Sequence, residues 1–281
     1  METKVERLEQ DITALAEFTA TPGAGVTRFS FTPEDRAARE YIKAEMARAG
    51  LTVREDAAGT VIGRREGAAP GPVVMVGSHF DSVKHGGRFD GTAGVVAALE
   101  IARVLKEHNV KTRYPIEFIA MIEEEGGRFG GGLFASRAMA GKVSREELAR
   151  NKDAQGVSTA EAMAAFGFPP ADIAAARRRP EELKAFFELH IEQGPVLEAA
   201  GIDVGVVETI VGIAEYEIEI TGRPDHAGTT PMDMRADALL AAGRVVQAVE
   251  ELARRAGGGA VGTVGRLEVT PGAANIVPGR G

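Results

Sequence analysis

The sequence predicts an α/β fold: a mixed, largely parallel sheet flanked by helices, followed by a smaller α+β domain. Residues 73–76 and 116–122 are apolar runs of strand length, as in strands that are covered on both faces. A helical pattern over residues 92–108 connects them, and a connection of this length favours parallel pairing. Residues 214–220 then alternate strictly between apolar and polar, which is typical of a strand with one face in solvent.

The elements before the first buried run follow from local patterns. Residues 3–18 repeat apolar side chains at helical spacing. A second helix is expected to start at Thr32, which offers an N-cap hydroxyl, and to end at Gly50. Two short β-like runs follow at residues 51–55 and 60–63.

The chain beyond residue 122 is expected to complete the first domain and begin a second. The expected elements are surface helices within residues 142–183, strands near 186–190, 203–209, 214–220 and 261–269, and a helix over 235–255. We place the boundary near residue 210. Residues 1–210 then form a catalytic domain, and residues 211–281 form part of a lid or dimerisation domain.

Composition excludes several classes of protein. The 281 residues include 33 Lys and Arg against 41 Asp and Glu, a net charge of −8, and no cysteine. The acidic balance argues against nucleic-acid and anionic-membrane partners. The lack of cysteine excludes disulfides, cysteine nucleophiles and zinc fingers, so a metal would need His, Asp or Glu ligands. Neither a signal peptide nor a membrane span is recognisable, and we expect a cytoplasmic protein.

Polar residues gather where the first buried run ends. His79 follows that run directly, and Asp81 is placed to orient its ring for metal binding. Asp90 lies in the glycine-rich segment before the next helix. Taken singly, His79 could be a surface histidine and Asp90 a helix cap. Ends of parallel strands are nevertheless where open α/β sheets hold their active sites.

The next two apolar runs end in the same manner. Three adjacent glutamates, residues 123–125, follow the second buried run, and His190 closes the third. Carboxylates this close repel one another unless a cation compensates them or one is protonated. A metal bound by one glutamate, with another left as general base, resolves that conflict. An exposed acidic turn is the alternative for the glutamates alone.

Longer motifs around these residues resemble the dinuclear-metal aminoacylase and carboxypeptidase superfamily. Within it, the EEGGRF and GRPDHAGTTPM segments are similar to the hydantoinase/carbamoylase branch, which comprises N-carbamoyl-L-amino acid hydrolases, allantoate amidohydrolases and β-ureidopropionases. The segments that carry the resemblance are GSHFDSV (77–83), GGRFDG (86–91), EEEGGRF (123–129), LHIEQGP (189–195) and GRPDHAGTTPM (222–232).

The resemblance implies a site for two divalent metal ions. Asp90 would bridge them, His79 and His190 would complete one site, and Glu125 would belong to the other. Glu124 would be the general base that deprotonates the attacking water and passes the proton to the leaving nitrogen. Zinc and manganese are the metals expected, and cobalt and nickel also suit such ligands.

The resemblance further implies how substrate is held. Gln193 matches a substrate-contacting position, and His226 and Asn275 match small-domain positions that reach the substrate. His226 would act across a homodimer interface to stabilise the oxyanion. The substrate is a small N-carbamoyl or ureido compound, and hydrolysis releases ammonia and carbon dioxide. The family also has a cis peptide after the bridging Asp, here Asp90–Gly91.

One departure from the family concerns the C-terminus. The family has a further metal-binding His and a carboxylate-binding Arg downstream of the Asn-Ile-Val-Pro-Gly motif, here residues 275–279, whereas this sequence ends at Gly281. His85 and His108 are poor substitutes because of their positions in a loop and at a helix end. We therefore expect a C-terminally truncated chain, and its own activity stays open.

Three alternatives stay open. An aminoacylase or dipeptidase of the same superfamily is the nearest. A nucleotide-binding oxidoreductase is remote: GGGLFA at residues 130–135 fits a dinucleotide fingerprint, but glutamates precede it where a pyrophosphate would be repelled. An inactive metal-binding remnant is the third, although it would not need to retain Glu124.

Overall fold

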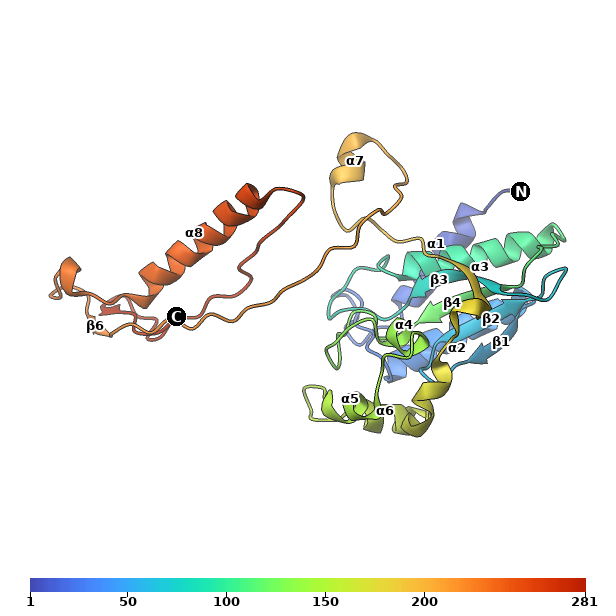
Figure 1. Cartoon of the computed structure of the whole chain (residues 1–281), viewed down its shortest axis with the longest axis horizontal. Helices are drawn as coiled ribbons and strands as arrows, with labels where there is room; N and C mark the ends of the chain where they lie inside the picture. The colour runs from blue at the N-terminus through green and yellow to red at the C-terminus, as the bar shows by residue number, and fades with distance from the viewer. The chain divides into compact units, whose positions relative to one another are not determined.

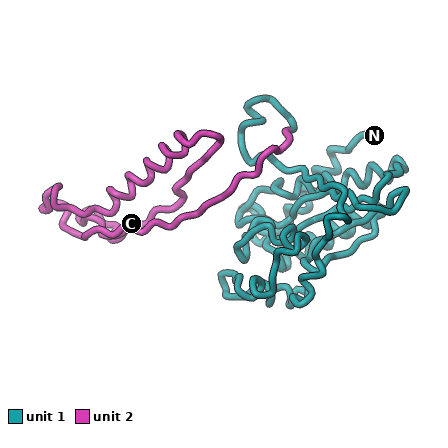
Figure 2. The backbone as a smooth tube through the Cα atoms, in the orientation of Figure 1, with its two compact units in different colours: residues 1–204 teal, residues 205–281 magenta.

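The computed structural model describes residues 1–281, the whole chain, and divides it into two compact units. Unit 1 comprises residues 1–204 and unit 2 residues 205–281 (Figure 2). The division after Val204 lies close to the boundary expected near residue 210. None of the helices combines the length and the apolar character needed to cross a membrane.

A five-stranded mixed sheet forms the centre of unit 1 (Figure 1). Its order is β1-β2-β4-β3-β5, with β3 parallel to both β4 and β5, and with β2 antiparallel to β1 and β4. The predicted α/β class is confirmed, with parallel pairing confined to the half of the sheet that carries the polar strand ends. The strands are β1 (Thr52–Glu55), β2 (Val61–Arg65), β3 (Val73–His79), β4 (Ile116–Met121) and β5 (Leu183–Phe187).

Two long helices, α2 (Pro33–Arg48) and α3 (Thr92–Glu107), lie against the sheet, and α1 (Val5–Ala16) packs on α3. Helix α3 contacts β3 and β4, whereas α2 contacts β1 and β2. The α2 N-terminus is capped as expected, because the Thr32 hydroxyl accepts a hydrogen bond from the Asp35 amide. Arg103 of α3 joins the three helices through ion pairs with Asp11 of α1 and Glu45 of α2.

Short helices follow β4 and pack around a group of phenylalanines. Serine side chains cap α5 and α6, in the latter case as a full capping box. Phe31 lies 5.6–6.4 Å, ring centre to ring centre, from four other rings of this region: Phe129, Phe134, Phe166 and Phe168. The elements are α4 (Phe134–Met139), α5 (Arg145–Arg150), α6 (Thr159–Phe166) and the 3-10 helices η1 (Pro170–Ala176) and η2 (Pro180–Glu182).

The carboxyl ends of β3 and β4 are aligned at one edge of the sheet. His79 pairs in register with Met121, so the loops that follow both strands start side by side. The backbones approach so closely here that a Cβ on Gly77 would lie 2.0 Å from the Ile119 carbonyl oxygen. Parallel pairing therefore brings residues from three distant parts of the sequence to one place.

Unit 2 contains one long helix and little strand. Helix α8 (Ala238–Ala256) follows the 3-10 helix η3 (Met232–Met234), and the only ladder joins β6 (Asp225–His226) to β7 (Ile276–Val277). In unit 1, the segment after β5 carries a further short helix, α7 (Val196–Ala200).

Several expected strands are absent, and the prediction was wrong there. Residues 203–209, 214–220 and 261–269 form no strand, and the strand expected at 186–190 instead spans β5, Leu183–Phe187. A β-strand requires a hydrogen-bonded neighbour. Residues 214–220 have such pairing only at their end, between Ile220 and Gly281, and Tyr216 is 85% exposed.

Candidate metal centre

His79 is the buried centre of the candidate site, with only 1% of its surface exposed. Its Nδ1 lies 3.2 Å from the Asp81 carbonyl oxygen and 3.5 Å from Asp81 Oδ1. Both neighbours are acceptors, so Nδ1 carries a proton, and Nε2 is the ring nitrogen left to bind a metal once it is deprotonated. Nε2 faces the other site residues and lies 3.7 Å from Glu124 Oε2.

His190 lies beyond β5 and faces His79. Its Nδ1 lies 2.9 Å from the Ile191 carbonyl oxygen, which fixes the same tautomer as in His79. Its Nε2 lies 3.5 Å from His79 Nε2, and the two rings are stacked with centres 5.7 Å apart. The Nε2 atoms of the two imidazole rings thus face each other.

Asp90 completes this group. Its Oδ1 lies 3.1 Å from His190 Nε2 and 3.8 Å from His79 Nε2, yet it is buried and has no hydrogen-bond partner. Its Oδ2 accepts a hydrogen bond of 2.7 Å from Gln193 Nε2. The carboxylate is therefore held through one oxygen, while the other faces the two histidines.

The peptide bond after Asp90 is trans, so the expectation of a cis Asp90–Gly91 bond was wrong; the only cis bond is Thr270–Pro271. Gly91 instead makes the turn with a positive φ of 56°. A Cβ on Gly91 would lie 2.4 Å from the His79 ring, so only glycine fits beside the histidine.

Asp81 holds the two glutamates that follow β4. Its Oδ1 accepts a hydrogen bond from the Glu124 amide at 3.1 Å, and its Oδ2 accepts one from the Glu125 amide at 3.2 Å. One buried carboxylate thus positions the Glu124–Glu125 pair and also faces His79.

Burial and the neighbouring charges raise the pKa values of three groups of the site. Burial and the neighbouring Asp90 carboxylate raise the pKa of Glu125 to about 7, and burial also raises the pKa of Glu124. Burial alone would lower the pKa of His79, but the hydrogen bond to Asp81 and the surrounding carboxylates raise it to about 9. Negative charge is therefore concentrated around this histidine.

These donors fit a divalent metal ion. Side-chain ligand atoms of His79, Asp90 and His190 lie within 4.8 Å of one another, and so do those of His79, Glu124 and Glu125. Imidazole nitrogens and carboxylate oxygens suit zinc and manganese. The unpartnered Asp90 Oδ1 between two histidine nitrogens is the observation that fits a cation best, since a buried carboxylate oxygen otherwise needs a hydrogen-bond donor.

Within unit 1, the structure brings together seven of the residues predicted from the sequence. Those together are His79, Asp81, Asp90, Glu124, Glu125, His190 and Gln193. His226 and Asn275 belong to unit 2, where the Asn275 carbonyl oxygen accepts from the Ala227 amide.

Sequence reasoning missed a further carboxylate, that of Glu188. Its Oε1 accepts a hydrogen bond from the Ser78 hydroxyl at 2.5 Å, and its charge contributes to the raised pKa of Glu124. Its position two residues before His190, at the end of an apolar run, was the available signal.

Comparison with known proteins agrees with this geometry. The model of peptidase family M20/M25/M40 matches residues 74–275, which include every predicted site residue. The chain belongs to this family. An M20 relative, the N-carbamoyl-L-amino-acid amidohydrolase of Paenarthrobacter aurescens, is 52% identical over 98% of this chain and 67% of the relative.

A further relative and a solved structure indicate the branch of the family to which the chain is similar. The allantoate amidohydrolase of Escherichia coli is 38% identical over 98% of this chain and 67% of the relative. A crystal structure of a hydantoinase/carbamoylase family amidase from Burkholderia multivorans matches with a TM-score of 0.83 and 38% identity, over 99% of this chain and 67% of that chain. The resemblance seen in the sequence is confirmed, because these relatives are named as amidohydrolases and as a hydantoinase/carbamoylase family amidase.

The Asp81 carboxylate gives a first test of the site. Asp81→Ala removes the acceptor for the Glu124 and Glu125 amides, and we expect metal affinity to fall about 10- to 100-fold while the protein stays folded. Titration calorimetry with manganese measures the affinity. Unchanged affinity in a folded Asp81→Ala variant would show that Asp81 does not organise the ligands.

Proposed function

We propose that this chain is a metal-dependent amidohydrolase that cleaves the ureido C–N bond of N-carbamoyl-L-amino acids. One water is consumed, and the free amino acid, carbon dioxide and ammonia are released. The convergence of two histidine nitrogens on the unpartnered Asp90 Oδ1 carries the proposal. Relatives of 52% and 49% identity that bear the name N-carbamoyl-L-amino acid amidohydrolase support this substrate class.

His79, Asp90 and His190 would hold one metal ion, and Glu125 would contribute to a second that shares Asp90. A bound divalent metal supplies a Lewis acid that polarises the ureido carbonyl and lowers the pKa of water. Zinc and manganese are the proposed ions, with cobalt and nickel as chemically suitable substitutes.

Glu124 is the proposed general base. Its carboxylate lies beside the metal ligands, with Oε2 3.7 Å from His79 Nε2. It is partly exposed, with 32% of its side-chain surface accessible, so substrate can reach it. Burial raises its pKa, which brings it closer to the pH at which it must first take a proton from water and then deliver it to the leaving nitrogen.

Gln193, His226 and Asn275 are the proposed substrate contacts. His226 Nδ1 accepts hydrogen bonds from the Gly228 and Thr229 amides at 3.0 and 3.2 Å. The neutral ring therefore carries its proton on Nε2, which suits a donor to a developing oxyanion.

We also propose a homodimer formed through unit 2, in which His226 of one subunit serves the site of the other. The exposed position of His226 and the apolar side chains that α8 exposes, such as Leu240 and Leu252, are compatible with this arrangement. Size-exclusion chromatography with light scattering measures the mass in solution, and a monomer at all concentrations would contradict it.

Ammonia release tests the proposed activity. Purified protein loaded with zinc or manganese is incubated with N-carbamoyl-L-amino acids, allantoate, N-acetyl amino acids and a dipeptide. We expect ammonia from the N-carbamoyl compounds, and loss of activity after chelation that metal restores. Preference for allantoate would place the chain with the allantoate amidohydrolases. Hydrolysis of the acetyl compound or dipeptide alone would contradict the proposal.

A further inference from the structure

Glu123, the first of the three glutamates after β4, has no part in the proposed reaction, yet its carboxylate is built into the fold. The residue is 2% exposed and has a positive φ of 50°, a backbone conformation that is unfavourable for a residue with a side chain. Its Oε1 accepts hydrogen bonds from the Phe129 amide at 3.0 Å and the Arg128 amide at 3.4 Å. The side chain thus crosses from the start of a loop to its far side.

The loop concerned, residues 123–134, carries Glu124 and Glu125 and is closed at its base. The Phe134 amide donates to the Glu123 carbonyl oxygen at 3.0 Å, and the Leu133 amide donates to the Glu124 carbonyl oxygen at 2.7 Å. Inside the closed loop, the carboxylate of Glu123 is the side-chain acceptor that ties its base to residues 128 and 129.

The far side of the loop is in turn fixed to the body of unit 1 by Arg128. Its Nη1 donates to the carbonyl oxygens of Ser30 and Phe31 at 2.8 and 3.0 Å, and its guanidinium pairs with Asp153 at 3.1 Å. Glu123 therefore connects this anchored side to the peptide that precedes Glu124 and Glu125.

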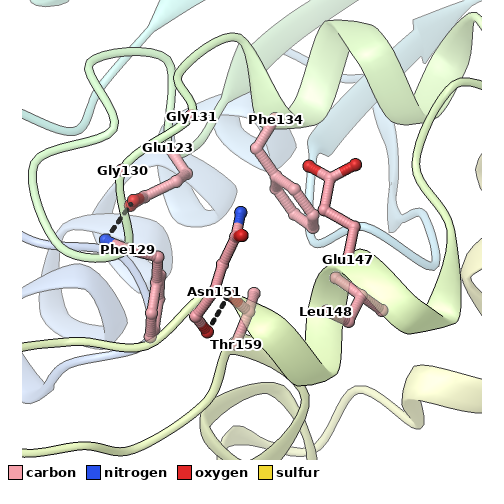
Figure 3. Close-up of a pocket in the computed structure, with 9 residues that line it drawn as sticks. All are labelled: Glu123, Phe129, Gly130, Gly131, Phe134, Glu147, Leu148, Asn151 and Thr159. Atoms are coloured by element: carbon pink, nitrogen blue, oxygen red, sulfur yellow. Dashed lines mark hydrogen bonds between the residues drawn. The ribbon is translucent and has the colours of Figure 1, made fainter.

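The surroundings of Glu123 argue against a ligand site of its own. It borders a cavity of only about 10 Å³ that is also lined by Phe134, Glu147 and Asn151, as Figure 3 shows. This volume admits no more than about one water molecule. No substrate or cofactor fits there, so the carboxylate is explained by what it holds in place.

The geometry points to Glu123 as a positioning residue for the metal centre. Together with Asp81, which accepts from the Glu124 and Glu125 amides, it fixes both sides of the segment that carries these two glutamates. The inference rests on the proposed function, because it takes Glu125 as a metal ligand. Its consequence is that metal affinity depends on a carboxylate that does not touch the metal.

Metal affinity of three variants tests the inference. Loss of an outer hydrogen-bond partner of a metal ligand lowers metal affinity about 10- to 100-fold. We expect Glu123→Ala to lose that much affinity for manganese. Titration calorimetry at a temperature well below the Tm of the variant measures this affinity. Glu123→Gln keeps an acceptor oxygen for the two amides, so its affinity should stay within about threefold of wild type, inside the usual context dependence of such interactions. Glu147→Gln, across the same cavity but bonded to Arg137, is the matched control and should bind as wild type.

The outcomes separate positioning from a purely structural role. A folded Glu123→Ala variant with a lower Tm and wild-type affinity would overturn the inference, and so would an equal loss in Glu123→Gln. If Glu123→Ala does not fold, Glu123→Asp decides: its shorter side chain should weaken manganese binding, and wild-type affinity would overturn the inference. Wild-type protein that binds manganese but releases no ammonia would contradict the proposed function alone, because the readout here is binding.

Discussion

Asp90→Asn is expected to weaken metal binding by more than the roughly 100-fold that loss of an outer hydrogen-bond partner can cause, and to abolish ammonia release. Asp90 Oδ1 is the buried oxygen that both histidine Nε2 atoms face, and it lacks any donor. Asparagine has the same shape but no charge to neutralise a divalent ion. Elemental analysis after dialysis and titration calorimetry with zinc and manganese measure the change.

The matched control for this prediction is Asp172→Asn, which alters an exposed aspartate in η1 and should leave metal content unchanged. Circular dichroism separates loss of metal from loss of fold. A folded Asp90→Asn protein with wild-type metal content would show that Asp90 is not a ligand.

Glu124→Gln is expected to lower kcat by about 10²- to 10⁴-fold, the usual contribution of a general base, while the metal content stays that of wild type. The amide cannot take a proton from water, but it keeps the size and shape of the side chain. The measurement is steady-state ammonia release from an N-carbamoyl-L-amino acid, with elemental analysis of the same sample.

The adjacent glutamate provides the comparison. Glu125→Gln should lose bound metal and activity together, because Glu125 is the proposed ligand and Glu124 the proposed base. The side chains of both lie within ligand distance of His79, so only this pair of variants separates their roles. Loss of metal in Glu124→Gln with retention in Glu125→Gln would reverse the assignment.

The central half of the sheet could be predicted from the sequence because burial on both faces leaves a continuous apolar run. The runs at residues 73–76 and 116–122 became β3 and β4, and the helical pattern between them became α3. Chain direction and the length of the connection then determined that the two strands are parallel. The two ends of α2 could also be predicted, because they depend on local chemistry: Thr32 caps its N-terminus, and Gly50, with a positive φ of 81°, follows the C-cap Ala49.

Strands of unit 2 could not be predicted in the same way. The alternating pattern of residues 214–220 shows that the segment suits a strand, but a ladder also requires a neighbour at hydrogen-bonding distance. The local sequence does not show whether such a neighbouring strand is present. The same reason explains β5, whose bounds follow its pairing with β3 rather than the limits of its apolar run.

Much of the candidate site was readable because its residues stand at strand ends within distinctive motifs. His79, Asp90, Glu124, Glu125 and His190 were all named from the sequence, and the structure gathers them. The hydrogen bonds that hold these residues could be predicted from the sequence only in part. Asp81 was expected to orient His79, whereas its role as acceptor for two backbone amides and the similar role of Glu123 depend on loop conformation.

The most direct test of the account is an anomalous diffraction map of crystals of this chain grown with zinc or manganese. We expect a metal peak in contact with His79, His190 and Asp90, and its loss in crystals of Asp90→Asn. A well-ordered His79, Asp90 and His190 with no peak between them, or a metal bound only elsewhere on the chain, would contradict the proposed metal centre and the reaction that depends on it.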